Sequence, residues 1–141
     1  MNRRMMMKMG LVGTAAAVIA PRAVLAETPM GDPFKSPFAG ALFYTADAPG
    51  RWAGKQGGHV PMIERSGSTI KVTTGHEMDG FNHYIIKHII MDDGFGFVDE
   101  TMFNPESDAP ISQHEIGGLK NLVYAISLCN KHDAWLNVIE L

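Results

Sequence analysis

The chain has 141 residues, of which 45% are apolar and 19% charged, enough for one domain with its own hydrophobic core. This balance excludes a disordered or membrane-embedded protein. The single cysteine, Cys129, excludes an intrachain disulfide and any metal site made of four thiolates. The formal charge of −3 conceals a basic N-terminus on an acidic chain, and fifteen glycines with eight prolines favour a turn-rich, mostly β fold.

The N-terminus has the three parts of an export signal. Basic side chains come first, an apolar stretch occupies residues 9–20, and a cleavage motif of small and aliphatic residues ends at Ala26. The stretch is shorter than the roughly 20 apolar residues that a membrane-spanning helix needs. Arg3 and Arg4, followed by apolar residues and Lys8, fit the twin-arginine pattern. A general secretory signal with a chance arginine pair is the alternative.

Removal of residues 1–26 makes the chain strongly acidic. The segment contains four basic residues and no acid, so the 115 residues that remain carry 8 basic and 15 acidic side chains and a formal charge of −7. This charge argues against nucleic acid as a partner. We therefore expect a periplasmic or otherwise exported protein without stable membrane insertion of the mature chain.

The mature chain divides into two parts of different texture that form a single domain. Residues 27–61 contain five of the eight prolines and predict an irregular segment, whereas residues 62–141 contain short apolar and β-branched runs separated by turn residues. With no long helical pattern between them, these runs predict an all-β fold, an antiparallel β-sandwich. The expected strands are residues 69–74, 83–91, 94–98, 122–129 and 134–141.

Six histidines and Cys129 are the residues most able to carry chemistry. Cys129 and His132 lie three residues apart in a loop between two expected strands, so both can turn toward one ion. His76 and His83 bracket a turn, and His59 follows two glycines in a loop. Imidazole and thiolate are the ligands that iron and copper accept in proteins, so the pattern predicts a loop-built metal site.

Four segments that carry these residues resemble the superoxide reductase family, also called neelaredoxin or the iron-centre domain of desulfoferrodoxin. The order and rough spacing of the segments match the family over about residues 55–141, and the single cysteine implies the short, one-domain form. The segments are Gly58-His59-Val60-Pro61, His76-Glu77-Met78, His83-Tyr84-Ile85, and Cys129-Asn130-Lys131-His132 with Trp135.

The resemblance implies an immunoglobulin-like β-sandwich with one mononuclear iron. It implies four equatorial nitrogens from His59, His76, His83 and His132, an axial sulfur from Cys129, and an open sixth position. It also implies that superoxide is reduced there to hydrogen peroxide with electrons from an external donor, which the sequence does not identify. Whether the chain forms a homo-oligomer is left open.

Three departures from the family pattern bear on activity. The family places a lysine directly before the first ligand, where this chain has Gly57 and Gly58; Lys55 is the candidate to replace it, and Lys131 lies beside the last ligand. Glu77 stands where proline is usual, and its carboxylate is a candidate to approach the open position. Lys55 and Glu77 are therefore the candidate catalytic residues. The third departure is a gap one residue longer between His76 and His83, together with Asp133 where glycine is common.

The remaining candidate residues are assigned structural roles. We expect His88 to be a surface or partly packed histidine, His114 to lie in a polar loop, and Trp135 to be a core or site-wall residue. Two other functions stay open. One is a copper- or iron-binding protein for electron transfer or metal handling on the same scaffold, without superoxide turnover. The other is a non-catalytic interaction domain, which leaves the histidines and Cys129 unexplained.

Overall fold

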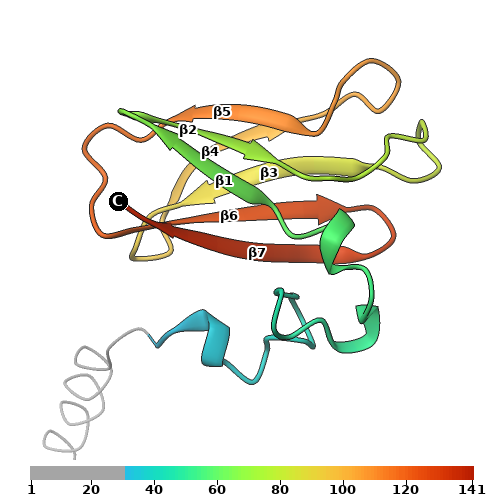
Figure 1. Ribbon diagram of the computed structural model, residues 1–141, viewed down its shortest axis with the longest axis horizontal. Coiled ribbons are helices and arrows are strands. Elements are labelled where there is room, and N and C mark those ends of the chain that lie inside the picture. Colours follow the sequence, from blue (N-terminus) through green and yellow to red (C-terminus); the bar gives the residue numbers. More distant parts are fainter. Residues whose placement is uncertain (1–30) are drawn as a thin grey trace, which may run out of the picture. The chain divides into compact units, whose positions relative to one another are not determined.

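The computed structural model describes residues 31–141 (Figure 1). The export signal expected at residues 1–26 lies outside the described residues. Within the described residues, no helix has the length and apolar character needed to cross a membrane.

Two antiparallel sheets make up the fold and confirm the all-β sandwich (Figure 1). Every pairing between two named strands in residues 31–141 is antiparallel. The three-stranded sheet has the order β1 (Met62–Ser66), β2 (Thr69–Thr73), β5 (Ile111–Glu115). The four-stranded sheet has the order β4 (Phe97–Met102), β3 (Ile85–Met91), β6 (Leu122–Cys129), β7 (Asp133–Glu140).

The core forms between the two sheets. Ile70 and Val72 alternate with exposed Lys71 along β2 and are fully buried, which is the period of two expected of a half-buried strand. They pack against Ile90 of β3 and Val123 of β6 in one apolar cluster. This burial fixes the register of β2 against its neighbouring strands, because a slip by one residue would turn these side chains out of the core.

Two strands were missed by the sequence reading, β1 and β5. β1 is almost wholly exposed, so it carries no apolar pattern. β5 alternates correctly, but its two buried positions are the polar residues Ser112 and His114. An alternation of polar residues gives no hydrophobic signal.

The strand expected at residues 94–98 begins later, at Phe97, and extends to Met102. The Asp92 carboxylate accepts hydrogen bonds from the backbone N–H groups of Gly94 and Gly96. Phe95 between them has a positive φ of 62°. An aspartate that binds backbone N–H groups two and four residues on stabilises a turn in place of a strand.

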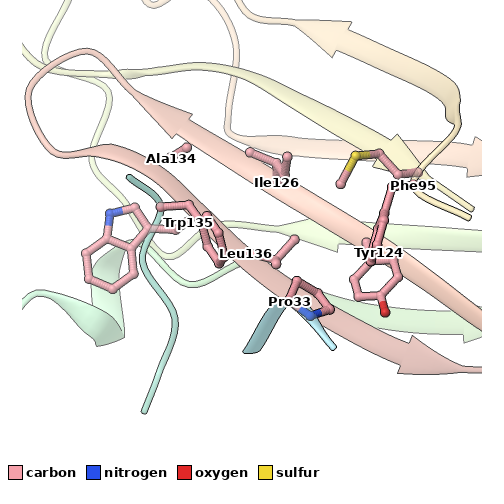
Figure 2. A pocket seen from close by; sticks show the side chains of 9 residues that line it. Pro33, Phe95, Tyr124, Ile126, Ala134, Trp135 and Leu136 are labelled. Carbon is pink, nitrogen blue, oxygen red and sulfur yellow. The ribbon is translucent and has the colours of Figure 1, made fainter. Parts of the chain in front are cut away.

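Residues 31–61 contain three short 3₁₀ helices, η1 (Pro33–Lys35), η2 (Gly50–Trp52) and η3 (Gln56–Gly58), and no named strand. Tyr44 fastens this segment to β7: its backbone N–H donates to the Ala134 carbonyl, and its carbonyl accepts from Leu136. Between the segment and the sheet lies an apolar cavity of about 170 Å³, lined by Pro33 and by residues of β6 and β7 (Figure 2). Trp135 forms one wall of that cavity.

The strand ends that frame the site meet at one end of the sandwich. Ile85 at the start of β3 pairs with Cys129 at the end of β6, which in turn pairs with Asp133 at the start of β7. His83 precedes β3 and His132 precedes β7. The antiparallel topology therefore gathers residues that are far apart in the chain.

Candidate metal centre

Five side chains converge at this end of the sandwich. One ligand-type atom from each residue lies within 4.8 Å of every other. The residues are the five that the sequence singled out: His59, His76, His83, Cys129 and His132.

The four imidazoles form a roughly square set of nitrogens. His59 Nε2 lies 3.0 Å from His132 Nδ1, which lies 3.1 Å from His83 Nε2, which lies 3.1 Å from His76 Nε2. The fourth edge joins His76 to His59, whose ring centroids are 4.7 Å apart, whereas the diagonal pair His59 and His83 is separated by 6.3 Å. A square with such edges has its centre about 2.2 Å from each nitrogen, close to the roughly 2.0–2.1 Å of a zinc–imidazole bond.

The sulfur of Cys129 lies over one face of this square. It is 3.7 Å from His132 Nδ1 and 3.9 Å from His76 Nε2, two opposite corners. A sulfur at those distances in the plane of the square would overlap a nitrogen of His59 or His83. It therefore occupies an axial place.

Burial distinguishes the two faces of the square. Cys129 is 3% exposed and packs with Ile85 and Phe103, and the Lys131 backbone N–H points at its sulfur at 3.5 Å. Three of the four histidines are only partly buried. The sulfur side is thus closed by protein.

Backbone carbonyls hold two of the rings in the orientation a metal needs. His59 Nδ1 bonds the Lys55 carbonyl at 2.8 Å, and His76 Nδ1 bonds the Glu77 carbonyl. Because a carbonyl only accepts, each Nδ1 carries the proton and each Nε2 presents a lone pair toward the centre of the square. This is the usual outer support of a metal-binding histidine.

Burial also favours the neutral form of the His59, His83 and His132 imidazoles by lowering the pKa of each. It lowers the pKa of His59 to about 4. Burial, and then the neighbouring imidazoles, lower the pKa of His83 and of His132. Neutral imidazole is the form that binds metal, so at pH 7 these donors need not lose a proton first. The donor set fits a borderline transition metal such as iron or copper.

Lys55 and Glu77 do not belong to the group of donor residues, but the backbone carbonyl of each bonds one of the donor imidazoles, His59 and His76 respectively. Both are exposed. After burial and the nearby imidazoles, the Lys55 charge lowers the pKa of His132, and Lys55 with Lys131 does the same to His83, whereas Glu77 raises it. All three charges therefore act on the His83 imidazole.

The predictions for His88 and His114 were wrong. Both are buried, at 0% and 2% exposure, and His114 lies in β5. They belong to a hydrogen-bonded chain that crosses the core. It runs through Ser127, Thr74, His88, Ser112, His114 and Asp99, with separations of 2.7–2.8 Å. Trp135 was placed correctly: it is fully buried, and its ring centroid lies 5.5 Å from that of His59.

The sequence reading missed Arg51 and Trp52. The Trp52 indole donates to the Asp133 carboxylate at 2.9 Å, Arg51 donates to the same oxygen, and the Trp52 ring stands edge-on to His132 at 4.7 Å. The Trp52 hydrogen bond, and then that of Arg51, hold the pKa of Asp133 below its usual range. No local pattern could have shown this contact, because its partners are more than 80 residues apart.

Solved structures share this fold. No protein-family profile and no curated protein matches the sequence. A variant of the superoxide reductase (neelaredoxin) from Ignicoccus hospitalis aligns with a TM-score of 0.65 and 25% identity over 72% of this chain and 94% of that chain. A second variant of the same protein gives 0.61 and 26% over the same shares. The superoxide reductase from Giardia intestinalis gives 0.51 and 23% over 59% of this chain and 97% of that one.

The fold and the site together define a β-sandwich protein with a His/Cys group able to bind a metal. The fold is that of the superoxide reductase family, as the resemblance in the sequence implied.

Proposed function

We propose that this protein is an exported superoxide reductase that converts superoxide to hydrogen peroxide at one mononuclear non-haem iron. The observation that carries the proposal is the meeting of four imidazole nitrogens and one thiol sulfur within 4.8 Å of one another. The fold is similar to that of a protein from Ignicoccus hospitalis that is named a superoxide reductase, and this similarity supports the same chemistry.

His59, His76, His83, His132 and Cys129 would hold the iron. A bound iron would supply the single electron that, with two protons, turns superoxide into hydrogen peroxide. A thiolate is a strong electron donor to iron, so Cys129 would favour that transfer. Because protein buries the face of the square on which Cys129 lies, superoxide would approach from the opposite face.

Superoxide is an anion, and the mature chain carries a formal charge of −7. Lys55 and Lys131 counter that repulsion locally, because their positive charges act on the His83 and His132 imidazoles. Glu77 contributes a negative charge beside His83. We assign Lys55 the role of attracting the substrate and Glu77 a role at the open position.

A second candidate function is copper or iron handling without superoxide turnover. The donor set itself favours this candidate, because imidazoles with a thiolate bind copper readily. The altered lysine position would suit a site not tuned for an anion.

The test uses protein matured through its native export route. Metal content and the decay of superoxide after pulse radiolysis, with reductant present, are measured on the same sample. One iron per chain with fast decay supports the proposal. Bound copper without turnover supports the second candidate, and a chain without stoichiometric metal overturns both.

A further inference from the structure

Asp133 occupies a backbone position that suits glycine better. Its φ is +64°, and it directly follows the ligand candidate His132. A side chain in this left-handed region is strained, although aspartate tolerates it better than most residues. Glycine would adopt it without strain. The Asp133 carboxylate makes contacts that can offset this strain.

The carboxylate holds η2 against the turn between β6 and β7. One oxygen accepts from the Trp52 indole at 2.9 Å and from the Arg51 guanidinium. Arg51 is fastened on its other side, since its Nε donates to the Tyr44 hydroxyl at 3.1 Å. Tyr44 is 1% exposed and pairs with Trp135 of β7.

From Trp52 the hydrogen bonds continue to the first ligand candidate. The Lys55 backbone N–H donates to the Trp52 carbonyl at 3.0 Å, and the Lys55 carbonyl accepts from His59 Nδ1 at 2.8 Å. An unbroken path thus joins Asp133 to His59, and it passes through the backbone of Lys55. His59 and Asp133 are 74 residues apart in the chain.

We propose that Asp133 is a positioning residue that, through Trp52 and the Lys55 backbone, fixes the His59 imidazole relative to His132. The inference rests on the proposed metal centre in one respect, that His59 and His132 bind the same ion. We call this path of hydrogen bonds from Asp133 through Trp52 to His59 the tether. A larger residue directly before His59 would restrict the backbone there, but Gly57 and Gly58 occupy those positions. The tether supplies that restriction instead.

The first test is made on metal-free protein. Hydrogen exchange of the Trp52 indole N–H is followed by NMR, with the indole of Trp135, the other of the two tryptophans, as internal reference. Trp135 donates to the His132 carbonyl, whereas the Asp133 carboxylate accepts from Trp52 and Arg51. In Asp133→Gly we expect the Trp52 indole to exchange roughly tenfold faster and that of Trp135 to stay unchanged. Asp133→Asn, which keeps one acceptor oxygen, should stay close to the natural protein.

If Asp133 only occupies the turn and positions nothing, Asp133→Gly should have the opposite effect on stability. Glycine would then relieve strain, so Asp133→Gly would be as stable as the natural protein or more stable, with unchanged indole exchange. That result would overturn the proposal. Thermal unfolding of both variants shows that they are folded.

The second test measures metal affinity by competition with a chelator, with iron as the probe. Asp133→Gly should lower the affinity about tenfold, as loss of an outer support does, and Asp133→Asn by much less. Trp52→Phe should lower it about as much as Asp133→Gly, and the double variant little further, since both break one path. Additive losses would refute the path. Failure of the natural chain to bind iron would refute the metal centre alone, because the indole exchange is read without metal.

Discussion

Cys129 is the one sulfur donor of the candidate site, and the other four donors are imidazoles. Replacing Cys129 therefore changes the electron donation to a bound metal and leaves all four imidazoles in place. Its sulfur is buried among Ile85 and Phe103. Serine has nearly the same volume, so Cys129→Ser should leave the sandwich folded.

The predicted result of Cys129→Ser is loss of the thiolate-to-metal charge-transfer band of the oxidised protein. Visible absorption and circular dichroism, measured on the same sample, read the band and the fold. Persistence of the band in the folded variant would show that the sulfur is not a ligand.

Lys55 is the second residue whose role can be isolated. Lys55→Ala should slow superoxide capture by roughly twofold to fivefold at low ionic strength and by less in salt, where charges are screened. Lys120→Ala is the matched control: it removes the same charge from an exposed loop just before β6, at the far end of the strand that ends in Cys129. Equal slowing in both variants would show that Lys55 acts only through the net charge of the protein and has no local role at the site.

At the scale of elements, the sequence predicted best where side chains alternate between water and core. β2 has Ile70 and Val72 inside and was predicted, whereas β5 buries Ser112 and His114 and was missed. A hydrophobic pattern cannot show a core position filled by a polar side chain whose partner lies on another strand.

The candidate site followed the same rule. Pairs that are close in sequence, such as Cys129 with His132, were visible as pairs. The tether from Asp133 to Trp52 was not, because topology alone brings its ends together.

The buried hydrogen-bonded chain through His88 links strands of both sheets, and it leads us to predict that the stability of the fold depends on pH. Burial, and then the nearby His114, lower the pKa of His88 from 6.5 to about 4. The unfolded chain binds this proton below pH 6.5 and the folded chain only near pH 4, so the stability that the shift contributes is complete above pH 6.5 and is lost as the pH falls toward 4. The loss is about 3 kcal/mol, at roughly 1.4 kcal/mol per pH unit.

Urea unfolding of metal-free protein between pH 4 and 7 measures this loss. His88→Gln is the control, because its amide keeps hydrogen-bonding groups and does not titrate. The variant should show a correspondingly shallower pH dependence, whatever its absolute stability. An equal dependence in both chains would show that His88 is not the titrating group.

Across the whole molecule, the basic segment of residues 1–26 and the acidic remainder of the chain lead to a prediction about export. Replacing Arg3 and Arg4 together by lysine keeps the positive charge, so a general secretory signal would still function. A twin-arginine signal needs the arginines themselves. We predict that the double variant stays in the cytoplasm in a fractionation assay, whereas replacement of Arg22 by lysine leaves export unchanged. Export of the double variant would contradict the twin-arginine assignment.

The meeting of the five donors on one ion is tested most directly by X-ray absorption at the metal edge of protein matured through its native route. We predict one iron whose neighbours include four imidazole nitrogens and one sulfur, with the sulfur absent in Cys129→Ser. An iron without a sulfur neighbour in the natural chain, or one surrounded by oxygen alone, would contradict it.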